Sequence, residues 1–435
     1  MSASMRQSLA RAGYSLLLRG VVPLYRLRLL WRGRREPLYA TAIGERFGRY
    51  REPFVPGALW LHAVSLGETR AMAPLVDALR AARPDLRFVF THGTATGRAA
   101  GEALLRNGDR QVWLPFDTPG AVRRFLHSAK PIAGVLMETE IWPNLLAAAA
   151  RDGVPVVLAN ARLSARSRRR GKRVDALLRP AFASLAAALA QSDDDAKRLR
   201  DAGARDVSVV GNLKYDLAPD PQLLARGRAW RDGIAGGIVV AASTREGEEA
   251  DLLAAWRANA APRPLLVVVP RHPQRFDAVA ELIENAGFTL SRRSAWHDGQ
   301  PPRDAGACDV WLGDSMLEMP AWYALGDVAL LGGSFAPLGG QNLIEAAACG
   351  CPLVLGPHTF NFSAAAELAI GAGAAVRVAD IGSAVAAAVA LVSPAEAPQR
   401  TRRSDAAFAF AGAHRGAAAR MAARILHVAE RRGAR

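Results

Sequence analysis

The chain has 435 residues, half of them hydrophobic, and its 56 Lys and Arg outnumber its 40 Asp and Glu to give a net charge of +16. These numbers exclude a disordered chain, suggest two or three domains, and indicate an acidic partner: nucleic acid, an anionic lipid surface, or a phosphorylated or carboxylated substrate. Three cysteines are too few for a disulfide framework, so we expect a reduced, cytoplasmic protein.

Residues 1–35 form a basic, amphipathic segment. Apolar and aromatic side chains alternate with arginines between Tyr14 and Arg35, and no uncharged run reaches the ~18 residues of a clear membrane-spanning helix. No small-residue cleavage site follows, so we do not expect a removable signal peptide. The segment predicts association with an anionic membrane, with the rest of the chain on the cytoplasmic side; an ordinary surface helix is the alternative.

Between residues 36 and 217 short apolar runs alternate with helical segments. Continuous runs of Val, Leu and Ala are typical of parallel strands buried on both faces. The pattern therefore predicts a doubly wound α/β domain. Its strands are expected at residues 58–63, 87–91, 111–115, 132–137, 154–160, 185–191 and 207–211.

A linker with two prolines, at residues 215–222, separates this domain from a second one at residues 218–403. The same alternation restarts there, which predicts a second α/β domain. A basic, Ala-rich stretch at 404–435 is expected to form a single closing helix. The strands of the second domain are expected at residues 238–242, 265–270, 310–313, 328–332, 353–356 and 375–378.

Charged residues follow several strands of the first domain. Because Pro74 favours a helix start close by, we expect the helix to begin near Ala71 and Glu68 to lie on the preceding loop. There it could act as a general base or simply stabilise the helix N-terminus. Glu138 and Glu140 follow a later strand, and Lys214 just before the linker could neutralise an anion or be an ordinary surface charge.

The turns of the second domain offer groups suited to a nucleotide. Arg271 and Arg275 follow one strand, and a glycine-rich turn precedes a helix that begins near Asn342. Glu345 could accept both ribose hydroxyls, while the helix start could hold a phosphate; ordinary capped helices and a tightly packed glycine turn are the alternatives. No P-loop, Asp-x-Asp pair or metal-ligand cluster is present in the sequence, so we expect neither a metal nor a cofactor.

Seven segments, taken in order, resemble the bacterial 3-deoxy-D-manno-octulosonic acid (Kdo) transferases of lipopolysaccharide synthesis: "WLHAVSLGET", "LPFDTP", "METEIWPNL", "LANARLSARS", "ASTREGEE", "VPRHPQRF" and "GGQNLIEAAACGCPLVLGPHTFNF". The resemblance implies a GT-B fold, in which two Rossmann-like domains face each other across a cleft. It implies transfer of Kdo from CMP-Kdo to the lipid A precursor lipid IVA, on the cytoplasmic side of the inner membrane and without nucleic acid as a partner.

The resemblance also implies roles for individual residues. Glu68 would be the general base, and Glu138 and Lys214 would stabilise the transition state. The family often has glycine where this chain has Leu317, so contacts of that turn are less certain. A nucleotide-sugar epimerase of the same fold, or a non-catalytic basic protein, remains as an alternative. The implied CMP-binding residues are Pro270, Arg271, Gly313, Asp314, Ser315, Asn342, Leu343, Ile344 and Glu345.

Overall fold

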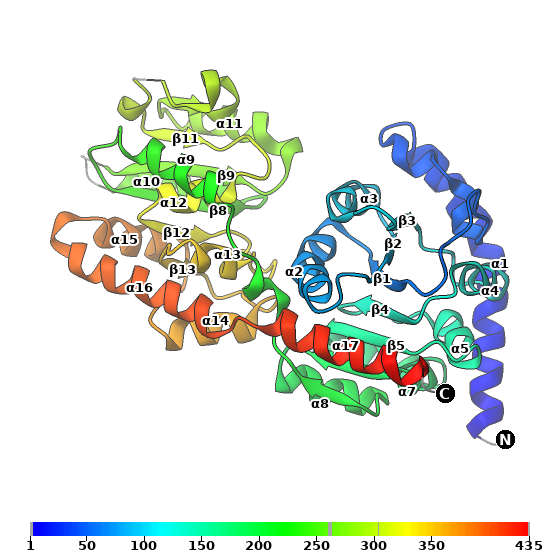
Figure 1. Cartoon of the computed structure of the whole chain (residues 1–435). Helices are drawn as coiled ribbons and strands as arrows, with labels where there is room; N and C mark the ends of the chain where they lie inside the picture. Colours follow the sequence, from blue (N-terminus) through cyan, green and yellow to red (C-terminus); the bar gives the residue numbers. More distant parts are fainter. Residues whose placement is uncertain (1–2, 260–262, 303, 434–435) are drawn as a thin grey trace. The chain divides into compact units, whose positions relative to one another are not determined.

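The computed structural model describes residues 3–259, 263–302 and 304–433 and divides the chain into two compact units (Figure 1). Unit 1 comprises the chain up to Leu217 together with the residues from Arg415 onward, and unit 2 comprises Ala218–His414. The sequence predicted this boundary at the linker, between residues 217 and 218. Each unit contains one parallel sheet of seven strands.

The sheet of unit 1 has the strand order β3-β2-β1-β4-β5-β6-β7, and every neighbouring pair is parallel. Strand order reverses between β1 and β4, which is where doubly wound sheets bind ligands at the carboxyl ends of their strands. All residues of β1, β2, β4, β5 and β6 are buried, as the continuous apolar runs predicted. The strands are β1 (Leu59–Ala63), β2 (Phe88–His92), β3 (Arg110–Trp113), β4 (Ala133–Met137), β5 (Val156–Ala161), β6 (Ala187–Ala190) and β7 (Val207–Val209).

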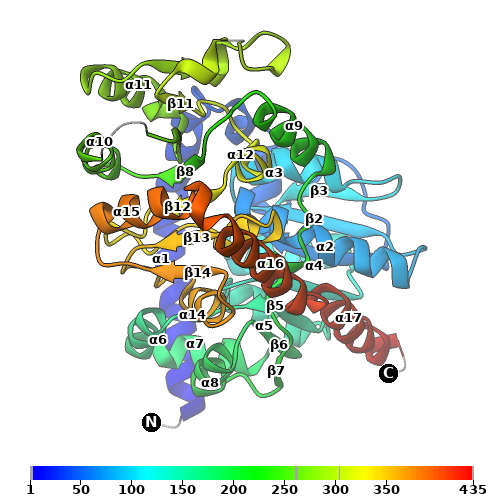
Figure 2. The same cartoon turned by 90° about the vertical axis from the view of Figure 1, so that its left-hand side faces the viewer.

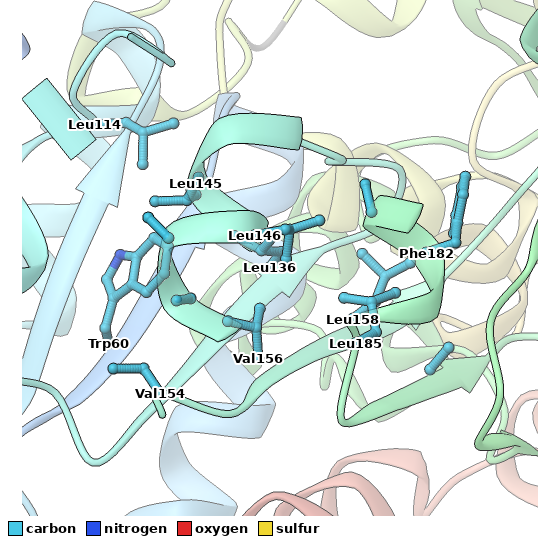
Figure 3. Close-up of a cluster of buried hydrophobic side chains, with 14 of the residues drawn as sticks. Trp60, Leu114, Leu136, Leu145, Leu146, Val154, Val156, Leu158, Phe182 and Leu185 are labelled. Atoms are coloured by element: carbon cyan, nitrogen blue, oxygen red, sulfur yellow. The ribbon is translucent and has the colours of Figure 1, made fainter. Parts of the chain in front are cut away.

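Helices cover both faces of this sheet. One face packs against α2 and α17, and the other carries a core that includes Trp60, Leu136, Leu158 and Phe182 (Figure 3). A Cβ at position 134 would lie 2.5 Å from the Trp60 ring, so only glycine fits beside this tryptophan. The helices are α2 (Leu66–Ala82), α3 (Ala95–Gly101), α4 (Pro119–Ala129), α5 (Pro143–Arg151), α6 (Ala165–Gly171), α7 (Asp175–Ala183), α8 (Asp193–Ala202) and α17 (Ala417–Gly433).

Helix α1 (Ala3–Arg32) lies against α5 and α7 and presents its other face to solvent. Val22 and Leu29 are buried, and the Ser15 hydroxyl donates to Asn144 Oδ1 (3.1 Å). Within the described residues no single helix is long and apolar enough to cross a membrane; only the bent pair Ile381–Leu391 and Pro394–Arg431, taken together, has the required length and composition. The large apolar side chains that α1 exposes are Met5, Leu9, Leu16, Leu17, Val21, Leu24, Tyr25, Leu27, Leu30 and Trp31.

The sheet of unit 2 has the order β10-β11-β9-β8-β12-β13-β14, again entirely parallel. Figure 2 shows β8, β12, β13 and β14 with α15 alongside. Its strands are β8 (Ile238–Thr244), β9 (Leu265–Pro270), β10 (Leu290–Arg292), β11 (Val310–Leu312), β12 (Val328–Leu331), β13 (Leu353–Leu355) and β14 (Ala375–Arg377). Its helices are α9 (Pro221–Arg231), α10 (Glu248–Ala258), α11 (Phe276–Asn285), α12 (Met319–Leu325), α13 (Leu343–Ala348), α14 (Ser363–Gly371), α15 (Ile381–Leu391) and α16 (Ala397–Ala413).

Three predictions are corrected. Helix α2 begins at Leu66 rather than near Ala71, so Glu68 lies in its first turn and Pro74 in its interior. The strand β10 was not predicted. The closing helix at 404–435 is wrong, because α16 ends at Ala413 and α17 begins at Ala417. Gly416 has a φ of 92° and its N–H donates to the Asp216 carboxylate, which also accepts from the Ala418 N–H and so caps α17.

Candidate active site

Glu68 lies in the first turn of α2, the helix that follows β1. The Ser65 hydroxyl oxygen accepts from the Glu68 N–H (3.4 Å), while the Glu68 carboxylate accepts from the Val64 N–H (2.7 Å) and the Ser65 hydroxyl (3.1 Å). This reciprocal arrangement is a capping box. Burial raises the pKa of Glu68; the Val64 hydrogen bond opposes the shift and the charge of Glu138 adds to it. Because each carboxylate oxygen has a further lone pair, the side chain can hold this position and still accept a proton.

Glu138 and Glu140 follow β4, the neighbour of β1. Glu138 has a φ of 58°, which is uncommon for a residue with a side chain. Its N–H donates to the Ala159 carbonyl (2.9 Å) and its carbonyl accepts from the Arg162 N–H (3.2 Å), which hold this conformation. Burial raises the pKa of Glu140 to about 7, and the charges of Glu68 and Glu138 contribute to the shift. Strained backbone and shifted carboxyl pKa values together are typical of functional sites.

Lys214 lies in the 3-10 turn η5 (Leu213–Asp216), which follows β7. Its Nζ is 4.0 Å from Glu138 Oε1. Burial lowers the pKa of Lys214, the Glu138 charge opposes this, and the nearby Arg162 lowers it further. Two cations and three carboxylates, Glu68, Glu138, Glu140, Arg162 and Lys214, thus influence one another in what we call the charged cluster.

Three amide side chains hold the turn that carries Lys214. Asn212 Oδ1 accepts from the Lys214 N–H (3.0 Å), and Asn160 Oδ1 accepts from the Leu213 N–H (3.1 Å). Gln191 connects the two asparagines, since its Oε1 accepts from Asn212 Nδ2 (3.1 Å) and its Nε2 donates to the Asn160 carbonyl (2.9 Å). No role was predicted for these three residues, because it depends on contacts between segments that are far apart in the chain.

In unit 2, Pro270 ends β9 and Arg271 begins the next turn. The Arg271 N–H donates to the Thr244 carbonyl (3.0 Å), and its side chain is exposed. Within the described chain no ion pair involves Arg271. The suggestion that Arg275 binds phosphate is not supported, because its guanidinium donates twice to the Glu249 carboxylate, at 2.6 and 2.9 Å.

The turn after β11 contains Gly313 and Asp314. The Gly313 N–H donates to the Val268 carbonyl (2.8 Å). The buried Asp314 carboxylate accepts from Arg292 Nε (2.8 Å) and from the Ser294 N–H (2.7 Å) and hydroxyl (2.6 Å). These contacts make Asp314 a residue that shapes the turn.

Ser315 and Leu317 complete this turn. The Ser315 hydroxyl donates to Glu318 Oε2 (2.5 Å). Leu317 has a φ of 72°, in the left-handed region that favours glycine, and its side chain is 56% exposed. The backbone here therefore has a conformation that glycine adopts more readily than leucine.

The glycine-rich turn after β12 is held by Glu248, at the start of α10. Its Oε2 accepts from the Gly333 and Arg245 N–H groups (2.8 and 2.9 Å), and its Oε1 accepts from those of Phe335 and Ala336 (3.2 Å each). Glu248 is buried. This role of Glu248 was not predicted, because the glycine-rich turn that it holds lies some 85 residues away in the chain.

Asn342 is the N-cap of α13, and its Oδ1 accepts from the Ile344 N–H (3.3 Å). Leu343 and Ile344 are fully buried, so only their backbone can face a ligand. Glu345 is half-buried in the first turn. The turns that follow β9, β11 and β12 all lie at the carboxyl edge of one parallel sheet, in the strand order β11-β9-β8-β12.

Comparison with known proteins identifies the family. The family model described as 3-deoxy-D-manno-octulosonic-acid transferase (kdotransferase) matches residues 41–217. The 3-deoxy-D-manno-octulosonic acid transferase of Bordetella pertussis is 47% identical over 426 residues, which cover 95% of this chain and 98% of the relative. The chain belongs to the Kdo transferase family.

The Kdo transferase of Haemophilus influenzae is 36% identical over 338 residues, covering 75% of this chain and 78% of that protein. A solved UDP-GlcNAc 2-epimerase from Neisseria meningitidis covers 86% of this chain and 99% of its own, with a TM-score of 0.56 and 15% identity. That identity shows the fold alone. The Kdo transferase is thus a glycosyltransferase of lipopolysaccharide biosynthesis with a GT-B-like α/β fold.

The structure of this Kdo transferase brings Glu68, Glu138 and Lys214 together in unit 1. Glu140 and Arg162 join them, although the sequence analysis assigned no role to Arg162 and left the role of Glu140 open. The implied CMP-binding residues all lie in unit 2. In residues 3–259, 263–302 and 304–433, no group of three or more His, Cys, Asp or Glu is arranged to hold a metal ion.

Proposed function

We propose that the chain transfers Kdo from CMP-Kdo to lipid IVA with inversion at the anomeric carbon. The observation that carries this proposal is the charged cluster, in which a carboxylate of raised pKa, Glu68, lies near the Glu138–Lys214 pair at the strand ends of unit 1. A partly buried carboxylate of raised pKa is suited to general-base catalysis near neutral pH. Membership of the family supports the sugar that is transferred.

In the proposed step, the primary hydroxyl of the acceptor glucosamine attacks the anomeric carbon of Kdo. Glu68 accepts the hydroxyl proton as the new C–O bond forms. The bond between the anomeric carbon and the phosphate oxygen breaks, and its electron pair leaves with CMP. General-base assistance of this kind contributes roughly 10²–10⁴-fold. Lys214 and Glu138 would stabilise the charges that develop around the reacting centre.

Unit 2 would hold the donor through its strand-end turns. Arg271 is an exposed cation after β9, and the turns at 313–315 and 342–344 would add backbone N–H groups other than those of Gly313 and Ile344, which already donate within unit 2. Glu345 would accept hydroxyl groups of the ribose. A single phosphate needs less countercharge than a pyrophosphate, so the proposal involves neither a metal nor a cofactor.

Helix α1 would bind the anionic inner membrane from the cytoplasmic side. Ten large apolar side chains of α1 are exposed, together with Arg6, Arg11, Arg19, Arg26 and Arg28, and the helix contains no Asp or Glu. Apolar and cationic groups on one exposed surface are suited to the interface of an anionic bilayer.

The proposed reaction can be tested by incubating the purified full chain with CMP-Kdo and lipid IVA, with and without EDTA, and weighing the products by mass spectrometry. We expect lipid IVA with added Kdo, equimolar release of CMP, and no effect of EDTA. A lipid of unchanged mass, with an acceptor and donor known to be intact, would refute the proposed substrates. Loss of product with EDTA would refute the metal-free step.

A further inference from the structure

A cavity of about 320 Å³ in unit 1 lies beside the loop that carries Glu138 and Glu140. It is separate from the charged cluster but shares the loop between β4 and α5. The core residue Phe182 forms part of its wall and lies close to Leu158 and Leu185 (Figure 3). Its apolar walls and its side facing the loop are formed by Thr139, Ile141, Leu163, Leu178, Phe182 and Ala202.

The charges that line this cavity neutralise each other. Arg168 Nη1 is 3.5 Å from Asp175 Oδ1, and Arg168 Nη2 donates to the Asp201 carbonyl (2.7 Å). The side of the cavity formed by Ile141, Leu163, Leu178, Phe182 and Ala202 favours an apolar occupant, and an anion would have to compete with Asp175 for the arginine. The Arg168 Nε–H is buried and has no acceptor among the described residues, so a carbonyl of a bound ligand could satisfy it.

The segment that lines the cavity through Ser167, Arg168 and Gly171 is strongly basic. Helix α6 and the 3-10 turn after it contribute five exposed cations, and none of them forms an ion pair with any residue that the structure describes. An apolar cavity beside unpaired cations matches a molecule with a hydrocarbon chain and an anionic headgroup. The five cations are Arg166, Arg169, Arg170, Lys172 and Arg173.

We propose that this cavity holds one acyl chain of the lipid acceptor, while the basic side chains of residues 166–173 bind its phosphate. The inference rests on the proposed function, since it concerns the acceptor of that reaction. The acceptor is favoured over a bulk membrane lipid because Thr139 and Ile141 belong to the same short loop as Glu138 and Glu140. An acyl chain seated there would fix the acceptor beside the residues that react with it.

The test fills the cavity without disturbing the backbone. Gly171 lies in its wall, and a Cβ at this position would be 3.4 Å from Leu178 Cδ1, an ordinary van der Waals contact. The variant Gly171→Leu would therefore occupy the space that the acyl chain needs. Gly371→Leu is the matched control, because Gly371 also ends a helix, α14, and a Cβ there meets nothing within 4 Å.

Both variants and the wild type are assayed with lipid IVA in detergent micelles and with the same phosphorylated disaccharide stripped of its acyl chains. The stripped compound is measured as a substrate or, if it is not glycosylated, as a competitive inhibitor. For Gly171→Leu we expect the KM for lipid IVA to rise about tenfold, the loss of contact with about two methylene groups. Its kcat and its affinity for the stripped compound should stay within twofold, and Gly371→Leu should change nothing.

An equal loss of affinity for both compounds, or no loss for either, would overturn the proposal. Should Gly171→Leu fail to fold, Leu178→Gln makes the same wall polar at similar size, and the same result is expected for it.

The triple change of Arg169, Arg170 and Arg173 to Gln tests the phosphate contact. It should weaken the binding of both compounds and reduce the salt dependence of binding; unchanged affinity for both would refute the phosphate contact. If the wild type glycosylates neither compound, it is the proposed function that fails.

Discussion

The carboxylates at the strand ends of units 1 and 2 have different surroundings, although both units are built on parallel sheets of seven strands. In unit 1, burial and mutual repulsion raise the pKa values of Glu68 and Glu140. In unit 2, Glu248 accepts four backbone N–H groups and Glu249 accepts twice from Arg275. Burial alone would raise the pKa of Glu318, but hydrogen bonds from Ser315 and Arg293 lower it.

The difference indicates how one architecture serves two tasks. Carboxyl groups with raised pKa values can exchange protons with a substrate, whereas carboxylates saturated with donors hold loops in place. Unit 1 therefore has the properties of the reacting half and unit 2 those of a half that binds a ligand through shaped turns. Substitutions that remove a carboxylate of raised pKa from unit 1, or a donor-saturated carboxylate from unit 2, test this division of tasks.

The largest effect is expected for Glu68→Gln. Gln keeps the size of the side chain and can still complete the capping box, since Gln serves at this position and the Ser65 hydroxyl can reverse its role. It cannot accept the proton, so kcat should fall by roughly 10²–10⁴-fold. The measurement is single-turnover transfer of Kdo, with the melting temperature and CMP binding as controls. Turnover near that of the wild type in a folded protein would remove Glu68 as the base.

The matching change in unit 2, Glu248→Gln, should act on stability and binding rather than on chemistry. Both oxygens of Glu248 accept backbone N–H groups, so the amide NH₂ of Gln must face two donors. Leaving buried donors unpaired costs about 1–3 kcal/mol. We expect denaturant unfolding to show this loss, and isothermal titration to show about tenfold weaker CMP binding, with kcat at saturating donor unchanged. A loss confined to kcat would contradict the division of tasks between the units.

A smaller effect, a displacement of the pH profile, is expected for Glu138→Gln. As a base, Glu68 must be ionised, so kcat/KM should rise with pH through its raised pKa. The negative charge of Glu138 disfavours ionisation of Glu68 and so raises its pKa. Removing that charge lowers the pKa of Glu68, so the ascending limb should move to lower pH.

The control for this profile is Glu246→Gln, which neutralises an exposed carboxylate in unit 2. Its ascending limb should coincide with that of the wild type. A limb that stays in place in Glu138→Gln, or moves to higher pH, would show that Glu138 does not act on the base.

Most of the sheet architecture could be predicted from the sequence, because parallel strands buried on both faces leave continuous apolar runs. The exception is β10, whose three residues are only half-buried. The break between α16 and α17 escaped prediction because the Asp216 carboxylate that caps α17 is some 200 residues away in the chain. Such a contact has no local signature.

The start of α2 could have been predicted from the sequence, but the prediction was wrong. Pro74 was given more weight than the Ser65-x-x-Glu68 pattern, which is itself a helix start signal. The helix accepts Pro74 in its interior. At the sites, the residue types after each strand were informative, whereas the raised pKa of Glu140 and the four donors on Glu248 arise from burial and from distant segments. The sequence could therefore place candidate residues but not separate the reacting from the supporting ones.

The smallest effect is expected for Leu317→Gly, at a position with left-handed backbone conformation. A left-handed conformation costs a residue with a side chain about 1–2 kcal/mol, and glycine relieves this cost but loses more entropy on folding. The net change in the free energy of unfolding should be a gain of ~0–1 kcal/mol, measured by denaturant titration. Leu368→Gly is the control: this exposed leucine lies within α14, where glycine should destabilise by about 1 kcal/mol. If both variants were destabilised equally, the left-handed backbone at Leu317 would not be strained, and this turn would not hold its shape at a cost to the stability of unit 2.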